Sequence, residues 1–256
     1  MVKLMILSAV HGITGGRRDI YRFFCERVRN ITDKFGVEML VVGSEGEESE
    51  KITTSYGHHY IEYPNKPVSN KWNKGMLAVK EHNPTHVMIL GSDDFVSDKL
   101  IEDYLTIAGR RSSGIFGIKD SYYLGLNEQD RSFSKCGYWG GYPTGKIIGY
   151  ARVFTNEVLS CVGWQPWEEG LNRGLDFSVD RVMEQNEVIT RNVAYSILTK
   201  RWFHIDIKTK GNISSMKPLK LVSADYTKLL KTHLPLEADA MIDYINNFIK
   251  GVKSVW

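Results

Sequence analysis

The stretch His86–Asp94, which reads His-Val-Met-Ile-Leu-Gly-Ser-Asp-Asp, decides the fold predicted for this chain. Its apolar part has the length and composition of a buried strand. Two adjacent carboxylates, Asp93 and Asp94, follow where that strand ends. Because adjacent carboxylates repel each other, their position favours a divalent cation that offsets the charge. The alternative is that Asp93 and Asp94 cap the helix that follows.

Strand and helix patterns alternate upstream of this stretch. Strands are expected at residues 3–10, 37–42 and 59–63, and helices at residues 19–35, 47–56 and 69–81. Such alternation predicts an α/β fold with a mostly parallel central sheet and helices on both of its faces. Ligands of these folds bind at the carboxyl ends of the strands. We therefore expect Ser8, Glu45 and Ser92 to converge there.

The pattern changes downstream. Helices are expected at residues 98–108, 176–185 and 238–252, and a strand at residues 196–203. Glycine and aromatic residues are frequent between residues 114 and 150, which predicts short strands and loops that form a substrate wall. The aromatic residues of this wall are Tyr122, Tyr123, Phe133, Tyr138, Trp139 and Tyr142.

Composition narrows the class of protein. The 256 residues, 42% of them hydrophobic, suffice for one substantial core. A net charge of +3 does not establish a polyanionic partner. The three cysteines form no spaced pair, which favours a reducing compartment. Since no apolar run approaches the roughly 18 residues of a membrane span, we expect a soluble cytoplasmic protein, in the host cytoplasm if the protein is viral.

Lysines accumulate near the C-terminus. They fit either a solvated surface or a face turned toward phosphates. The lysines in question are Lys208, Lys210, Lys217, Lys220, Lys228, Lys231, Lys250 and Lys253.

Several short motifs occur in an order typical of a known enzyme family. Ser69–Gly75 places lysine and asparagine on a helix ahead of the acidic strand exit Gly91–Asp94. Gly149–Phe154 and Asn172–Asp176 follow it. On these motifs, residues 3–205 resemble the family-2 glycosyltransferases of the GT-A fold.

The resemblance implies a fold and a division of the chain. The fold is the Rossmann-like, three-layer nucleotide-sugar-binding domain called GT-A, with a small C-terminal helical extension. Residues 1–205 would form the catalytic domain, with a donor-binding half at 1–110 and an acceptor and catalytic half at 111–205. Residues 206–256 would form the C-terminal loop and helical extension.

The resemblance also implies ligands of the donor. Mn²⁺ or Mg²⁺ would be held by Asp94 and by a late histidine, His204, although a hydrogen-bonded core histidine is the alternative. Glu45 stands in the segment where the family carries an aspartate, so the base of the nucleotide stays open. The donor-binding residues would be Ser8, Ala9, Glu45, Lys71, Asn73, Ser92, Asp93 and Lys208.

Asp176 matches the family's catalytic base, which takes the proton of the acceptor hydroxyl. It is equally placed to be the N-cap of the helix that follows. Glu168 and Glu169 are alternative bases. Lys208 and Lys210 would close over the diphosphate of the bound donor, or would be ordinary surface lysines.

The expected function is therefore metal-dependent inverting transfer of a sugar from a nucleotide-sugar, with UDP as the expected nucleotide. The acceptor is a glycan or, as in bacteriophage enzymes, a hydroxymethylated base in DNA. A nucleotidyltransferase is an alternative, because the loop His11–Arg18 partly matches a glycine-rich phosphate loop. A noncatalytic nucleotide-sugar or nucleic-acid binding module is another. The adjacent His58 and His59 lack a suitably spaced third metal ligand and are expected to be structural.

Overall fold

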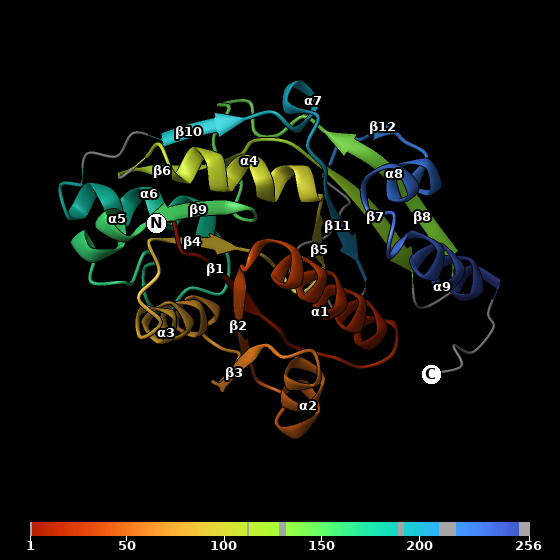
Figure 1. The fold of residues 1–256 in the computed structure, drawn as a ribbon, viewed down its shortest axis with the longest axis horizontal. Helices are drawn as coiled ribbons and strands as arrows, with labels where there is room; N and C mark the ends of the chain where they lie inside the picture. The colour runs from red at the N-terminus through yellow and green to blue at the C-terminus, as the bar shows by residue number, and fades with distance from the viewer. Residues whose placement is uncertain (1, 112, 128–131, 189–191, 210–218, 251–256) are drawn as a thin grey trace.

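The computed structural model describes residues 2–111, 113–127, 132–188, 192–209 and 219–250 (Figure 1). It contains a seven-stranded sheet, a five-stranded sheet and helices packed around both. Among these residues, no helix combines the length and the apolar character that a bilayer crossing requires.

The larger sheet has the strand order β10-β6-β9-β4-β1-β2-β3. β1 to β4 are parallel to one another, whereas β9 is antiparallel to both β4 and β6. The sheet is therefore mixed, which differs from the expected mostly parallel sheet. A strand that runs parallel to its neighbour requires a crossover connection between the two. β9 does not follow such a crossover, because the chain reaches it from β7 and β8 of the second sheet. The bounds are β1 Leu4–Ala9, β2 Glu38–Gly43, β3 His59–Glu62, β4 His86–Ile89, β6 Ile115–Ile118, β9 Arg152–Thr155 and β10 Asn192–Tyr195.

The helices between these strands lie close to their predicted positions. They are α1 Gly16–Phe35, α2 Glu47–Ser55, α3 Val68–Lys80 and α4 Asp98–Ala108. α1 buries the stripe Ile20, Phe24 and Val28. α4 begins after Ser97, whose hydroxyl accepts a hydrogen bond from the Leu100 amide at 3.3 Å. Asp93 and Asp94 are therefore not the N-cap of this helix.

The smaller sheet has the order β12-β8-β7-β11-β5. The sequence predicted only short strands and loops between residues 114 and 150, where β7 and β8 lie. β5 is antiparallel to β11, with Asp94 opposite Asp206 and Val96 opposite His204. This pairing brings the end of the Gly-Ser-Asp-Asp segment against a strand more than a hundred residues later. The bounds are β5 Asp94–Val96, β7 Ser121–Asn127, β8 Ser132–Trp139, β11 His204–Lys208 and β12 Val222–Ser223.

The predicted strand at residues 196–203 is wrong. The strand β10 ends at Tyr195, and the short helix α7 occupies Ile197–Lys200. The buried carboxylate of Asp120 fixes this turn, because it accepts hydrogen bonds from the Ile197 amide at 2.7 Å and from the Ser196 hydroxyl. A tertiary contact thus overrides the β-rich composition.

The C-terminal residues join the main core. α9 (Ala238–Lys250) contacts β8 and packs on α8 (Tyr226–His233), which was not predicted (Figure 1). The Tyr244 hydroxyl donates to the Gly16 carbonyl at 3.0 Å, and the buried Glu237 pairs with Arg27 at 3.4 Å. The boundary expected between residues 205 and 206 falls inside β11. Residues 251 and 252 of the predicted last helix lie outside the described chain, as do Lys210, Lys217 and Lys253.

Both faces of the larger sheet are buried at its central strands. Along β1, Leu4 and Ile6 belong to one hydrophobic cluster, and Met5 and Leu7 belong to another. The first cluster extends over α1, α4 and the smaller sheet, and the second over α3 and over α5 (Asn156–Cys161) and α6 (Leu175–Gln185). The strands therefore read as continuous apolar runs, as strands covered on both faces do.

Gly75 of α3 gives a test of this packing. A Cβ atom there would lie 2.4 Å from Val42 Cγ2 and 2.7 Å from Leu7 Cδ1. We predict that Gly75→Val lowers the free energy of unfolding by about 2 to 3 kcal/mol, because it overpacks the contact of α3 with β1 and β2. Chemical denaturation measures this loss, with the exposed neighbour Lys74→Val as control. Equal stabilities of the two variants would contradict the packing.

Candidate functional site

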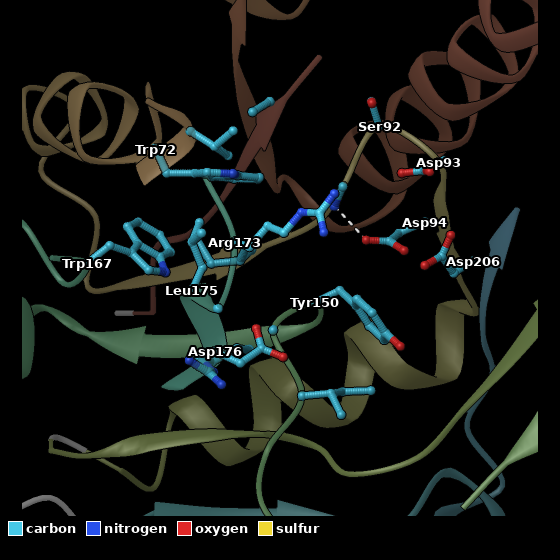
Figure 2. A pocket seen from close by; sticks show the side chains of 18 of the residues that line it. Trp72, Ser92, Asp93, Asp94, Tyr150, Trp167, Arg173, Leu175, Asp176 and Asp206 are labelled. Carbon is cyan, nitrogen blue, oxygen red and sulfur yellow. Dashed lines mark hydrogen bonds between the residues drawn. The ribbon is translucent and has the colours of Figure 1, made fainter. Parts of the chain in front are cut away.

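A cavity of about 650 Å³ opens at the carboxyl ends of β1 and β4. This volume lies within the usual range of small-molecule sites. Four carboxylates line it, Asp93, Asp94, Asp206 and Asp176 (Figure 2). The basic side chains that line it are Arg17, Lys71, Arg152, Arg173 and Lys208.

Asp93, Asp94 and Asp206 form a buried carboxylate cluster, in which one oxygen of each lies within 4.8 Å of the others. Asp93 follows β4, Asp94 begins β5, and Asp206 lies opposite Asp94 on β11. Burial raises the pKa of Asp206 well above its usual range; Lys208 opposes this shift, and the charges of Asp93 and Asp94 add to it. Asp206 was not predicted as a site residue, since nothing in its local sequence marks it.

The backbone around Gly91 fixes the carboxylate cluster. The Gly91 amide donates to Asp94 Oδ2 at 2.5 Å, and the Asp94 amide donates to the Gly91 carbonyl at 3.1 Å. The Ile207 amide donates to the Asp93 carbonyl at 3.0 Å. A Cβ atom at Gly91 would lie 2.8 Å from Asp94 Oδ2 and 3.0 Å from Asp93 Oδ1, so the turn has room only for glycine.

Two cations flank the carboxylate cluster. The buried Arg17 lies 3.3 Å from Asp93 and donates to the Ser92 hydroxyl at 3.1 Å. Lys208 Nζ lies 2.5 Å from Asp206 Oδ2. Burial disfavours the charged amine of Lys208, but the attraction of Asp206 and Asp93 prevails and raises its pKa. The sequence predicts Arg17 only as part of the His11–Arg18 loop and not as a site residue.

His204 lies next to Asp94 but does not belong to the carboxylate cluster. Its Nδ1 lies 2.6 Å from the Ser121 hydroxyl, and its ring stacks on Tyr150 with centroids 4.5 Å apart. Its Nε2 lies 3.3 Å from Asp94 Oδ1. The histidine expected as a metal ligand is thus fully buried against one of the carboxylates.

The chemistry of the carboxylate cluster fits a hard divalent cation. Within the described chain, three buried atoms have no hydrogen-bond partner: Asp94 Oδ1, Asp206 Oδ1 and His204 Nε2. His204 Nε2 approaches Asp94 Oδ1 to 3.3 Å, but this contact lacks hydrogen-bond geometry. Buried polar atoms without a partner are costly. Carboxylate oxygens are the ligands that Mg²⁺ and Mn²⁺ prefer.

Lys71, near the start of α3, projects into the same cavity. Its Nζ donates to the Val10 carbonyl at 2.5 Å and lies 3.0 Å from Ser44 Oγ and 3.4 Å from Asn65 Oδ1. Burial lowers the pKa of Lys71 to about 8, against the opposing attraction of nearby glutamates. This amine is therefore a cation that loses its charge at mildly alkaline pH.

Three predicted donor-binding residues, Ser8, Glu45 and Asn73, do not line the cavity. Glu45 Oε1 accepts hydrogen bonds from the Gly12 amide at 2.8 Å and from Ser44 Oγ at 3.2 Å. The Asn73 amide donates to the Trp167 carbonyl at 2.8 Å. Ser8 is fully buried. By contrast, Ala9, Lys71, Ser92, Asp93 and Lys208 line the cavity.

Asp176 faces the cavity from the first turn of α6. The N-cap of that helix is Gly174, in a left-handed conformation, so Asp176 is not the cap. The Tyr142 hydroxyl donates to Asp176 Oδ2 at 3.1 Å. A Cβ atom at Gly149 would lie 2.1 Å from Asp176 Oδ1, so glycine makes room for this carboxylate.

The alternative bases are placed differently. Glu168 accepts a hydrogen bond from Arg181 at 2.8 Å, Glu169 is exposed, and neither is among the residues that line the cavity. Figure 2 shows Asp176 apart from the carboxylate cluster, with the side chain of Arg173 extending toward Asp94. Arg173 belongs to the motif Asn172–Asp176, but the sequence predicts no binding role for it.

Aromatic side chains form much of the remaining wall. Trp72 and Trp167 lie together with ring centroids 5.8 Å apart, and Trp139 packs edge-on against Tyr142 at 5.2 Å. Phe177, 44% exposed, continues the wall outward from Tyr142 at 5.5 Å. The side chain of Phe133 lies outside the described part of the chain.

Comparisons with known proteins identify the fold. No protein-family model and no curated protein matches the chain. Among solved structures, S. aureus TarS 1-349 in complex with UDP aligns with 97% of this chain and 70% of its own, at 13% identity and a TM-score of 0.56. Its complex with UDP-GlcNAc aligns over the same shares of both chains, at 12% identity and a TM-score of 0.53.

The chain therefore has a mixed α/β fold. In particular, it shares the fold of TarS, which has been solved with UDP and with UDP-GlcNAc.

The turn at Gly91 gives a test of the carboxylate cluster. We predict that Gly91→Ala weakens Mn²⁺ binding at least about tenfold, because the new methyl group displaces the carboxylates of Asp93 and Asp94. Titration calorimetry with Mn²⁺ measures the affinity. Gly140→Ala is the matched control, since a Cβ atom there meets nothing closer than 4.0 Å. Equal Mn²⁺ affinities of the two variants would exclude the carboxylate cluster as the cation site.

Proposed function

We propose that the chain is a metal-dependent inverting glycosyltransferase that moves a sugar from a nucleotide-sugar, with UDP as its nucleotide, to an acceptor hydroxyl. One observation carries the proposal: a buried carboxylate cluster and a separate carboxylate, Asp176, line the same cavity together with several basic side chains. A nucleotide diphosphate with a divalent cation complements this arrangement in charge.

The donor diphosphate would lie at the carboxylate cluster. Asp93, Asp94 and Asp206 would hold Mg²⁺ or Mn²⁺, which stabilises the negative charge of the leaving diphosphate. Arg17 and Lys208 are already fixed beside these carboxylates, so they present positive charge without further ordering. His204 remains a proposed additional ligand through its unpartnered Nε2.

The shared fold supports the nucleotide. TarS 1-349 has been solved with UDP and with UDP-GlcNAc. We carry the uridine nucleotide over to this chain as a proposal, together with the GT-A fold. The donor would enter along Ala9 and Lys71, which line the cavity beside the carboxyl end of β1.

Asp176 would act as the base. It would accept the proton of the acceptor hydroxyl while that oxygen bonds to the anomeric carbon and the diphosphate leaves with the electrons of the broken bond. The attack comes from the face opposite the leaving group, so the anomeric configuration inverts. The Tyr142 hydroxyl orients the carboxylate, and the fully buried Arg152 contributes positive charge nearby.

The aromatic wall would bind the acceptor. Trp139, Tyr142 and Phe177 present flat apolar faces on the side of Asp176. Such faces stack on sugars and on extruded bases. We therefore keep both a glycan and a hydroxymethylated base in DNA as acceptor classes, and a steep salt dependence of acceptor binding would favour DNA.

The contacts of the His11–Arg18 loop weigh against a nucleotidyltransferase. The Gly12 amide, which a phosphate loop would offer to its ligand, donates to Glu45. Arg17 turns to Asp93 and Ser92. The loop is therefore occupied in supporting the carboxylate cluster.

Donor binding and turnover test the proposal. We predict that one member of a UDP-, GDP-, CDP- and TDP-sugar panel binds in Mn²⁺ or Mg²⁺ and not in EDTA. Asp94→Ala and Asp206→Asn should lose this binding. Asp176→Asn should retain it while slowing donor hydrolysis by about 10² or more, because only the base is removed. Calorimetry and release of the nucleotide measure the two quantities.

Asp180→Asn is the matched control, because this carboxylate lies one turn along α6 and pairs with Lys146 at 2.6 Å. It should bind and turn over the donor like the wild type. If no nucleotide-sugar binds under any condition, the glycosyltransferase proposal fails and nucleoside triphosphates become the next ligands to test. Binding without any turnover would identify a noncatalytic module.

The amine of Lys71 predicts a pH dependence. Its pKa of about 8 means that the charge is present below that pH and lost above it. Affinity for UDP should therefore fall as the pH rises through 8, by about tenfold in total if one charged contact is lost. Lys71→Met should bind UDP more weakly at pH 7 and lack this step. The affinity for UDP is measured as a function of pH for wild type, Lys71→Met and the exposed control Lys74→Met. If all three show the same pH dependence, Lys71 is not part of the donor site.

A further inference from the structure

Three side chains from different elements meet at the edge of the larger sheet. Glu38 begins β2, His59 begins β3, and His82 follows the end of α3. One ligand atom of each lies within 4.8 Å of the others. His59 Nε2 is 4.0 Å from Glu38 Oε2, and the two imidazole rings have centroids 4.5 Å apart. We call Glu38, His59 and His82 the histidine cluster.

The backbone holds each member of the histidine cluster in place. Glu38 pairs with Met5 in the parallel register of β1 and β2, and His59 pairs with Leu40. The His82 amide donates to the Val79 carbonyl at 3.0 Å, and its carbonyl accepts from Lys3 Nζ at 2.6 Å. The backbone positions of the three residues are therefore set by the fold.

The ligand atoms are also available. His59 is exposed, and Glu38 and His82 are partly exposed. Within the described chain, the polar contacts of these three side chains are with one another, through the 4.0 Å approach and the ring contact. His58 differs, because it turns inward and its Nε2 lies 2.9 Å from the Cys25 carbonyl.

We propose that the histidine cluster binds a transition-metal ion of the Zn²⁺ class. Two imidazoles and one carboxylate suit Zn²⁺, Co²⁺ and Ni²⁺, whereas the all-carboxylate cluster in the cavity suits Mg²⁺ or Mn²⁺. Three protein ligands leave the remaining coordination positions to water. The proposal does not depend on the proposed sugar transfer, since it concerns different residues and a different metal.

The position of this site indicates what the ion does. β3 is the edge strand of the sheet, and its four residues are partly or fully exposed. An ion at the histidine cluster ties this strand to β2 and to the connection between α3 and β4. Because the three ligands meet only in the folded chain, the ion stabilises the folded state by mass action.

Titration of the full chain with Zn²⁺ tests this site. We expect wild type to bind Zn²⁺ and to melt at a higher temperature in its presence than in EDTA. His59→Ala and His82→Ala should each weaken this binding at least about tenfold and remove the rise in melting temperature. Co²⁺ should give the visible absorption of an imidazole-ligated ion in wild type and not in these variants.

Two controls separate this site from others. Glu81→Gln changes an exposed carboxylate next to His82 and should leave Zn²⁺ binding unchanged. Asp94→Ala removes a ligand of the carboxylate cluster and should leave the Zn²⁺-dependent rise in melting temperature intact. Melting in EDTA shows that His59→Ala and His82→Ala still fold.

Two results would overturn the proposal. One is Zn²⁺ binding and stabilisation that persist in the double variant His59→Ala, His82→Ala. The other is Zn²⁺ stabilisation that disappears in Asp94→Ala, which would assign the ion to the cavity. Neither measurement uses a nucleotide-sugar, so failure of this proposal and failure of the proposed sugar transfer are distinguishable.

Discussion

The pairing of Asp94 with Asp206 across β5 and β11 is the constraint on which the site depends. Side chains directly opposite each other in an antiparallel pair point to the same face and lie close together, and like charges there are destabilising. Asp93 adds a third carboxylate, and all three are buried. A chain that keeps such an arrangement needs positive charge beside it, and Arg17 and Lys208 supply part of it.

The same few residues join the two sheets. β4 belongs to the larger sheet and β5 to the smaller one, and only the segment from Leu90 to Asp93 separates them. The tight turn at Gly91 and the bond from the Ile207 amide to the Asp93 carbonyl fix their relation. The carboxylate cluster therefore sits where the two sheets join: Asp93 lies in the connecting segment, and Asp94 and Asp206 lie on strands of the smaller sheet.

Local pattern was enough to predict the first half of the fold. The alternation of strands and helices up to β4 follows from apolar periodicity, because each element there buries a face that its own sequence defines. The mixed sheet and the α7 turn could not be predicted from local pattern. β9 pairs with β4, and Asp120 binds the start of α7, so both features depend on partners distant in sequence. Among the candidate site residues, Asp93 and Asp94 stood out because they follow an apolar strand, whereas Asp176 was proposed from the order of the family's motifs.

The sequence by itself determined that adjacent carboxylates leave an apolar strand and that a lysine-bearing helix precedes them. Only the tertiary structure decided which groups meet them. Asp206, Arg17 and the histidine cluster carry no local mark, because their significance comes from strand register and from packing between distant segments. Register and packing are set by the whole buried surface, which no short window of sequence contains.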